Sequence, residues 1–205
     1  PYTDGKYLIN ESFSCHKLIE KWIWERRFLK FEKPEFQLGK KSRKRNKLYC
    51  FHSKLTHSDL IIKVSEVSKD YKFWRKLDLY ITSLFKDYNY NSYIGTIKLQ
   101  EAGVNAINPI AYWAYKTSWL NRKSYFLYEK VESDLTVTEL CNEIINSKAQ
   151  DKRELFNAIT DQCIVIVQKI HIANIRHGDP HGGNILTDLV YDDINNISVE
   201  NIKNA

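Results

Sequence analysis

The sequence predicts an α+β fold in two parts, a sheet-rich first part followed by a helical second part. Short runs of aromatic and aliphatic residues recur up to about residue 129, whereas helical spacing dominates from about residue 134. Hydrophobic residues make up 43% and charged residues 27% of the chain, a globular balance that excludes disorder. We place the boundary after residue 130, so that residues 1–130, with an N-terminal extension, form the first part and residues 131–205 the second.

Two strand-like segments, 36–39 and 48–51, enclose a basic run and predict a hairpin with the run as its loop. The six cations of this basic run are Lys40, Lys41, Arg43, Lys44, Arg45 and Lys47. A solvated face explains such a run as well as a binding site does. As a site, it would meet either an anionic membrane surface or the phosphates of a nucleotide, and nucleic acid is not the expected partner.

The remainder of the first part predicts a strand, helices and two further strands. Residues 60–64 form a short apolar strand that contains Lys63, and residues 110–113 and 124–129 are apolar stretches of the same kind. Helical spacing covers residues 70–101, with a second helix that begins at about residue 92 and ends near residue 103. The apolar residues that share one helical face are Phe73, Leu77, Tyr80, Ile81 and Leu84.

The second part predicts helices over residues 134–146 and 152–172. A buried strand is expected to begin at residue 185, and another strand is expected over residues 197–202. In the longer helix, the apolar residues at core spacing are Leu155, Ile159, Cys163, Ile166 and Ile170.

The segment after the long helix, residues 177–184, has the spacing H-x-D-x-x-x-x-N of a kinase catalytic loop. In phosphoryl transfer the attacking hydroxyl must be oriented and its proton accepted, and Asp179 is the candidate for both tasks. The amide of Asn184, five residues later, is a suitable oxygen ligand for magnesium. The alternative is a glycine-rich turn in which Asp179 only caps the chain, but this does not explain Asn184 and the preceding helix together.

Other candidate residues lie around this motif. His177 and His181 are expected to support the loop, with contact to substrate as the alternative for His181. Lys63 would supply a positive charge to the α- and β-phosphates of a nucleotide, because lysine is uncommon inside an apolar strand, unless that strand lies at a sheet edge with Lys63 in solvent. The backbone from Glu129 to Val131, at the junction of the two parts, could receive an adenine ring.

Charge and cysteine usage narrow the class of protein. The formal net charge of +6 favours anionic partners. No apolar run of about 18 residues appears, so the sequence has no signal for membrane spanning. The four cysteines, at positions 15, 50, 141 and 163, are too far apart for a zinc site and too sparse for a disulfide framework, so we interpret them as reduced thiols of a cytosolic protein.

With these motifs in this order, the chain resembles the bacterial lipopolysaccharide-core sugar kinases, especially the heptose kinases, a branch of the protein-kinase-like superfamily. The resemblance runs from about residue 37 to residue 186. It rests on Leu60–Val64, on residues 100–104 (QEAGV) with Pro109 after them, on Ser124–Glu129 and, most specifically, on His177–Leu186.

The resemblance implies a two-lobed protein-kinase-like fold, with a sheet-rich N-terminal lobe and a helical C-terminal lobe that this chain contains only in part. It implies ATP and Mg²⁺ as cofactors and a heptose hydroxyl of the lipopolysaccharide core as the acceptor. It also implies a cytoplasmic location, peripheral on the inner membrane.

Two features depart from the kinase pattern. Kinases pair the strand lysine with a glutamate on the next helix, but no glutamate lies between residues 70 and 100; Asn91 is near the expected place and Asp87 is the nearest acid. A second metal-binding aspartate is expected a few residues beyond Ala205, so this chain by itself is not expected to turn over.

Two alternatives to a heptose kinase stay open. One is a related phosphotransferase that acts on a protein or on a small molecule such as an aminoglycoside. The other is a nucleotide-binding pseudokinase that serves as a scaffold in a membrane assembly. The missing glutamate favours the pseudokinase, whereas the intact Asp179 and Asn184 favour an enzyme.

Overall fold

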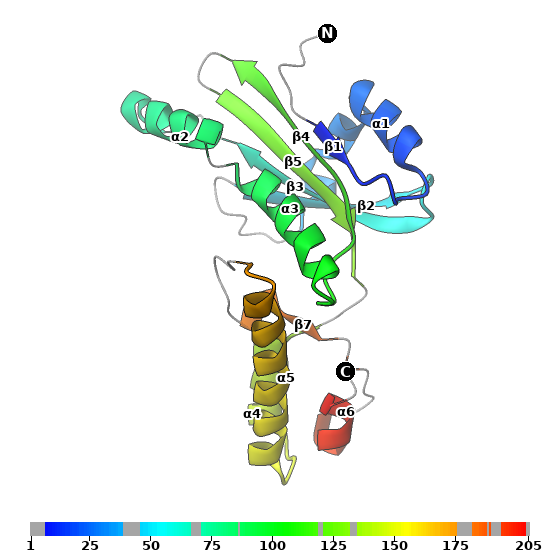
Figure 1. Ribbon diagram of the computed structural model, residues 1–205, viewed down its shortest axis with the longest axis vertical. Coiled ribbons are helices and arrows are strands. Elements are labelled where there is room, and N and C mark those ends of the chain that lie inside the picture. Colours follow the sequence, from blue (N-terminus) through cyan, green and yellow to red (C-terminus); the bar gives the residue numbers. More distant parts are fainter. Residues whose placement is uncertain are drawn as a thin grey trace. The chain divides into compact units, whose positions relative to one another are not determined.

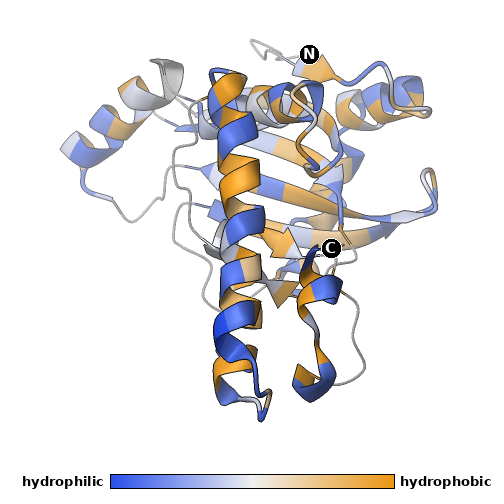
Figure 2. Ribbon diagram, turned by 60° about the horizontal axis from the view of Figure 1, so that its bottom comes forward, coloured by the Kyte–Doolittle hydropathy of each residue, from blue (hydrophilic) through white to orange (hydrophobic). Residues whose placement is uncertain are grey.

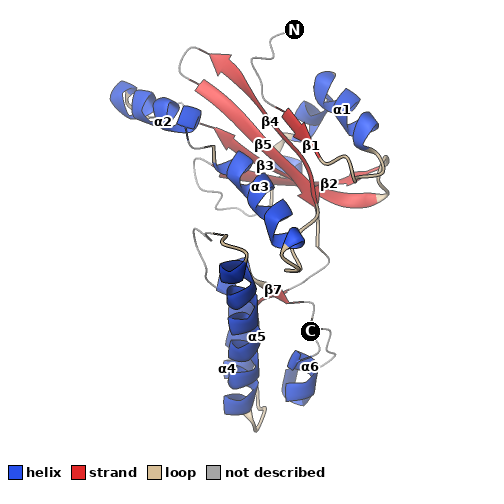
Figure 3. Cartoon of the chain, in the orientation of Figure 1, coloured by secondary structure: helices blue, strands red, loops and turns tan. Residues whose placement is uncertain are grey.

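The computed structural model describes residues 7–38, 46–66, 71–85, 87–118, 121–131, 135–175, 182–187, 189 and 194–203. The chain divides into two compact units. The first unit comprises Pro1–Ile97 and Ala106–Lys130, and the second comprises Lys98–Asn105 and Val131–Ala205. An antiparallel sheet dominates the first unit and helices dominate the second, which confirms the predicted α+β class (Figure 3).

The first unit is built on a five-stranded antiparallel sheet in the order β1-β4-β5-β3-β2 (Figure 1). Its strands are β1 (Tyr7–Ile9), β2 (Asn46–Ser53), β3 (Ser58–Glu66), β4 (Pro109–Ser118) and β5 (Asn121–Glu129). Two hairpins, β2–β3 and β4–β5, join through the pairing of β3 with β5, so that β3 and β5 are interior strands. Short β1, which the sequence did not predict, extends the sheet beyond β4.

Hydrophobic clusters cover both faces of the sheet, and this explains why the strand sequences are continuous apolar runs. In β4, Ala111 and Trp113 belong to one hydrophobic cluster, whereas Tyr112 and Ala114 belong to another. This alternation follows from the two-residue period of a strand. Hydrophobic residues accordingly recur along the strands in Figure 2.

The N-terminal extension covers the first face with α1 (His16–Trp24) and the 3₁₀ helix η1 (Arg27–Phe31). Phe28 is 1% exposed, and its ring centroid lies 5.0 Å from that of Trp113 and 4.9 Å from that of Tyr125. Just after η1, Glu32 accepts a hydrogen bond from Tyr125 Oη at 2.7 Å and pairs with Lys123 Nζ at 2.9 Å. Burial, and then the charge of Glu32, raise the pKa of Tyr125. The extension is thus an integral layer of the first unit.

The predicted hairpin around the basic run is only partly correct. Residues 34–36 form a 3₁₀ turn, η2 (Pro34–Phe36), and the described residues of the predicted strand 36–39 contribute a single bridge, between Gln37 and Tyr49. Proline at the first position favours the turn over a strand. Residues 39–45, with most of the basic run, lie outside the described residues, and Lys47 is exposed on β2.

The region between β3 and β4 forms two helices, α2 (Phe73–Phe85) and α3 (Tyr88–Glu101). The second helix begins four residues earlier than predicted, because Asp87 caps it: its Oδ1 accepts hydrogen bonds from the amides of Asn89 and Tyr90. Gly103, with φ of 70°, ends α3, and the amides of Gly103 and Val104 bond back to Gln100 and Leu99.

The apolar face predicted over residues 73–84 is only partly buried. Phe73 is 51% and Ile81 46% exposed, whereas Leu77 and Tyr80 are half-buried. Among the described side chains of α2, the buried one is Leu79, which lies outside the predicted face. Tyr93 of α3 instead joins Tyr112 and Phe126 in the cluster on the second face of the sheet.

The second unit packs α4 (Val137–Asn146) against α5 (Lys152–Ile172) and α5 against α6 (Val199–Lys203). Its core residues are Leu140, Ile144, Leu155, Ala158, Ile159, Ile197 and Ile202. The prediction of a strand over residues 197–202 is wrong, because these residues form the turn before α6 and most of that helix. The side-chain and backbone groups of Ser198 form hydrogen bonds with Asn201, as at the start of a helix.

Further short elements complete the second unit. A two-stranded sheet pairs β6 (Leu135–Thr136) with β7 (Leu186–Thr187), and η3 (Gly182–Asn184) and η4 (Ile194–Asn196) are 3₁₀ turns. Leu186 is 46% exposed, so the strand expected at residue 185 is short and not buried. No helix in the described part of the chain is long and apolar enough to cross a membrane.

We predict that Phe28→Ala lowers the free energy of unfolding by about 3–5 kcal/mol, because it opens a cavity between the extension and the sheet. Phe73→Ala, on the exposed side of α2, is the matched control and should change it by less than about 0.5 kcal/mol. Urea unfolding monitored by circular dichroism measures both values. Equal effects of the two substitutions would show that the extension is not part of the core.

Candidate functional site

Lys63 occupies an interior strand of the sheet. It pairs with Leu48 of β2 on one side and with Phe126 of β5 on the other, so the alternative of an edge strand is wrong. Its neighbours Ile62 and Val64 point into the cluster under the N-terminal extension. By strand alternation, Lys63 points to the opposite face, where α3 lies.

The contact of Lys63 on that face is Ser92 of α3. Lys63 Nζ donates to Ser92 Oγ at 3.5 Å, and Ser92 Oγ in turn donates to the carbonyl of Tyr88 at 2.8 Å. The serine proton is therefore committed to the helix backbone, and a lone pair of its oxygen faces the ammonium group. Asn91, which the sequence suggested for the place of the kinase glutamate, is exposed on α3.

Lys63 has no acidic partner among the described residues, since no ion pair within 4.0 Å involves its Nζ atom there. Burial lowers the pKa of Lys63, because desolvation disfavours the charged form and no carboxylate offsets it. A partly buried cation without a counter-charge is a site that an anionic ligand would neutralise.

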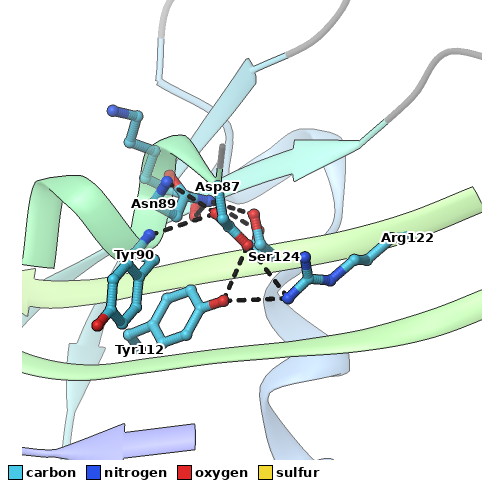
Figure 4. A network of polar contacts seen from close by, with 7 residues as sticks. Asp87, Asn89, Tyr90, Tyr112, Arg122 and Ser124 are labelled. Atoms are coloured by element: carbon cyan, nitrogen blue, oxygen red, sulfur yellow. Dashed lines mark hydrogen bonds and ion pairs between the residues drawn. The ribbon is translucent and has the colours of Figure 1, made fainter. Parts of the chain in front are cut away.

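Asp87, the acid nearest in sequence to the position expected for the kinase glutamate, has other contacts (Figure 4). Besides capping α3, its Oδ2 accepts from Tyr112 Oη at 2.8 Å and lies 3.5 Å from Arg122 Nη2. The side chain of Asp87 is 10% exposed and that of Arg122 is 18% exposed. Burial first, and then Asp87, raise the pKa of Tyr112. Asp87 therefore connects the start of α3 to β4 and β5.

Asn89 positions the backbone of Lys63, a role that sequence reasoning missed. Its side chain is fully buried, and its Nδ2 donates to the carbonyl of Lys63 at 3.2 Å and to that of Ser124 at 2.8 Å (Figure 4). One amide therefore joins α3 to β3 and β5. The sequence contains only an indirect signal of this role. Asn89 lies two residues after Asp87, so if Asp87 caps a helix, Asn89 falls in the first turn of that helix.

Glu129 ends β5 and is held by its surroundings. Its Oε2 accepts from Asn108 Nδ2 at 2.7 Å, and its amide donates to the carbonyl of Asn108 at 3.1 Å. The amide of Lys130 is likewise bonded, to the carbonyl of Asp59 at 2.8 Å. Val131, the other residue expected near an adenine ring, is 38% exposed and begins the second unit.

The central residues of the predicted catalytic loop, His177, Asp179 and His181, lie outside the described residues, and Asn184 is described only by its backbone in η3. The segment after the loop is firmly attached to α4. The amide of Val137 donates to the carbonyl of Ile185 at 2.9 Å, and β6 pairs with β7. The N-terminus of α4 is itself fixed by a reciprocal capping box between Thr136 and Glu139.

Gly182 is required by this attachment. A Cβ atom at this position would lie 2.9 Å from Thr138 Oγ1 and 3.3 Å from the amide nitrogen of Thr138. A larger residue would therefore require Thr138 to shift, so glycine best allows the end of the loop to approach the first turn of α4 so closely. The glycine of the motif thus has a structural reason that is independent of chemistry.

Metal binding and cysteine chemistry find little support in the described part of the chain. It contains no cluster of three or more histidine, cysteine or acidic residues that would hold a metal ion. All four cysteines are free thiols. Burial raises the pKa of Cys50, Cys141 and Cys163, which keeps these thiols protonated and unreactive.

We predict that Lys63→Met raises the free energy of unfolding at neutral pH, because it removes a desolvated charge. Since the pKa of Lys63 is lowered in the folded state, wild-type stability rises with pH up to the ordinary lysine value of 10.5. The stability difference between the variant and the wild type should therefore narrow as the pH rises towards 10.5. Urea unfolding at several pH values measures it.

Ser92→Glu is the complementary variant. A carboxylate at this position would lie beside Lys63 Nζ and hold the lysine charged, so the pH dependence attributed to Lys63 should disappear. A stability difference for Lys63→Met that stays constant with pH would show that the lysine charge is solvated after all.

We predict that Gly182→Ala lowers the free energy of unfolding of the second unit by about 1–3 kcal/mol through overpacking. It should also speed hydrogen exchange at the amide of Val137, which is bonded to Ile185. Gly182→Ala combined with Thr138→Ala should recover part of both effects, because the closest atom, Thr138 Oγ1, is gone. Unchanged exchange in the single variant would contradict the close approach.

Comparisons with known proteins give a distant likeness. No family model matches the chain, and no curated protein matches it. A solved structure described as "WaaP in complex with acyl carrier protein" aligns with 81% of this chain at 12% identity and a TM-score of 0.48. The chain spans 56% of the length of that protein.

Proposed function

We propose that the chain is part of an ATP- and Mg²⁺-dependent kinase that phosphorylates a hydroxyl group of a lipopolysaccharide-core heptose. The observation that carries the proposal is Lys63: a partly buried ammonium on an interior strand, facing a helix, with no carboxylate among the described residues to balance it. Structural lysines in a sheet normally reach solvent or pair with an acid. A lysine left without either is suited to nucleotide phosphates.

The order of parts supports the same proposal. A lysine strand, a helix against the sheet and a hairpin form the first unit, and the second unit has a long helix that leads into the H-x-D-x-x-x-x-N segment. We propose that the two units are the N- and C-terminal lobes of a kinase-like fold, with the boundary at residue 130. The heptose acceptor rests on the resemblance of the sequence motifs alone.

Each candidate residue has a role in this scheme. Asp179 orients the acceptor hydroxyl and takes its proton, Lys63 binds the α- and β-phosphates, and His177 and His181 support the loop. The backbone of Glu129 and Val131 receives the adenine ring. The amide oxygen of Asn184 is a hard ligand of the kind Mg²⁺ prefers, and the ion, when bound, neutralises phosphate charge.

The proposal places the protein in the cytoplasm, at the inner membrane where lipopolysaccharide core is assembled. The basic run at residues 40–47 would then face either anionic lipid or the nucleotide phosphates.

A nucleotide-binding pseudokinase is the second candidate function. The observation that favours it is Ser92, which stands opposite Lys63 where an active kinase has a glutamate. A pseudokinase would bind ATP without transferring phosphate. The acceptors of other phosphotransferases, a protein or an aminoglycoside, have no specific observation in their favour.

We predict that Asp179→Asn abolishes phosphate transfer and leaves ATP binding nearly unchanged, because the side chain acts on the acceptor hydroxyl. Cells that lack the gene would be complemented with the wild-type gene or with the variant, and the lipopolysaccharide core analysed by mass spectrometry. A heptose phosphate restored only by the wild type supports the kinase. ATP binding to the purified proteins would be followed by thermal shift with Mg²⁺, with the exposed Asn91→Ala as the control that changes neither.

Each alternative outcome has a distinct meaning. If the core gains no phosphate although the wild-type protein binds ATP, the heptose acceptor is wrong. If Asp179→Asn complements another phenotype of the deletion as well as the wild type does, the pseudokinase is favoured. Loss of ATP binding together with transfer would indicate that Asp179 is structural.

A further inference from the structure

The strand residues that surround Lys63 carry no charge at neutral pH. Lys63 pairs with Leu48 of β2 and with Phe126 of β5, which are both apolar. Cys50 and Tyr128 pair with the residue two positions earlier in β3, so their side chains share the face of Lys63. Burial raises the pKa of the Cys50 thiol, and it raises the pKa of the Tyr128 hydroxyl to about 12. Both groups are therefore neutral at pH 7.

Helix α3, which covers this face, also presents neutral groups to the lysine. Its contact is Ser92 Oγ, 3.5 Å from the lysine Nζ atom. Burial raises the pKa of Tyr93 on α3 and that of Tyr112 on β4, so that neither hydroxyl ionises near pH 7. The other charged residues of α3, which are exposed in its last turn, are Lys98 and Glu101.

The described acids on the same face of the sheet have partners of their own. Asp59 lies 3.0 Å from His52 Nδ1 and 3.9 Å from Lys130 Nζ. Asp87 lies 3.5 Å from Arg122 Nη2 (Figure 4). Neither acid lies within 4.0 Å of the Lys63 ammonium group, so neither balances its charge.

The protonation of Lys63 therefore depends on what binds beside it. Burial lowers the pKa of Lys63 below the ordinary value of 10.5 in the free protein. Phosphate groups beside the amine would favour its charged form and raise that pKa again. Below the lowered pKa both states carry the proton, and affinity does not depend on pH. Above it the free protein has lost the proton, so the dissociation constant rises by up to about tenfold per pH unit.

We infer that nucleotide binding draws a proton from the solvent onto Lys63, so that the protein binds nucleotide phosphates less tightly as the pH rises. The inference rests on the proposed function, which supplies the nucleotide. In this step the neutral amine of Lys63 takes a proton from the buffer and becomes the ammonium group that faces the phosphates, and no other bond changes. Ser92 is the positioning residue that permits it, because a carboxylate in its place would keep the proton on Lys63 before nucleotide arrives.

The test is isothermal titration calorimetry of the purified chain with ADP and Mg²⁺ from about pH 7.5 to about pH 9.5. ADP carries both phosphates that Lys63 is proposed to bind, and these are already ionised in this range because the second pKa of a phosphate is about 6. Heats measured in buffers of different ionisation enthalpy give the number of protons taken up. This number should rise with pH towards one, and the dissociation constant should rise about threefold or more.

Two substitutions on α3 form a matched pair. Ser92→Glu places a carboxylate beside Lys63, so proton uptake should be lost and the dissociation constant should no longer change with pH. Asn91→Glu adds the same charge at the neighbouring, exposed position and should take up protons as the wild type does. Lys63→Arg, whose guanidinium stays charged throughout this range, should bind ADP without proton uptake. Circular dichroism of each variant verifies that the fold is retained.

The possible failures are distinguishable. ADP binding without proton uptake at any of these pH values overturns the inference and leaves the proposed kinase standing. Equal proton uptake in the wild type and in Ser92→Glu also overturns it, because the proton then goes to a group other than Lys63. A wild-type chain that binds no ADP at any pH contradicts the proposed function itself, and the inference with it.

Discussion

The buried amide of Asn89 is the interaction on which the candidate site depends. Its nitrogen bonds the main-chain carbonyls of Lys63 and Ser124, and so connects α3 to the two interior strands of the sheet. A buried amide is stabilising only when its partners are correctly placed, and here Nδ2 has its partners whereas the buried Oδ1 has none among the described residues. The contact therefore specifies one position of α3 on the sheet, and with it the position of Ser92 relative to Lys63.

Asp87 reinforces the same position from the end of the helix. It caps α3 through Oδ1 and reaches Tyr112 and Arg122 through Oδ2. A carboxylate that accepts several hydrogen bonds while paired with an arginine is well compensated for its burial. Asp87 and Asn89 together therefore join the start of α3 to the sheet and to the strand that contains Lys63. Asp87, the acid nearest to the position expected for the kinase glutamate, serves the scaffold, and Lys63 has no counter-charge among the described residues.

The lack of a counter-charge beside Lys63 among the described residues links stability to ligand binding. A desolvated ammonium weakens the folded state, and such a cost is typical of binding sites that complete their electrostatics with a ligand. The glutamate of a typical kinase would relieve the cost before nucleotide binds, whereas Ser92 offers only a long hydrogen bond. If ATP is the ligand, its phosphates supply the negative charge that the described residues do not provide beside Lys63.

The sequence alone determined the α+β class, the strand with Lys63, the two long apolar strands of the β4–β5 hairpin and the helices α4 and α5, because these depend on local periodicity and spacing. The catalytic role of the loop at residues 177–184 stays a prediction. Only the tertiary structure decided which described side chains of α2 are buried and that segment 197–202 is largely helical. It also decided that residues 98–105 belong to the second unit and that Ser92 stands opposite Lys63. Periodicity shows that residues share a face, but the direction of that face depends on which distant segments fold against it. The role of Asn89 was hidden for the same reason, since its two carbonyl partners lie 26 and 35 residues away.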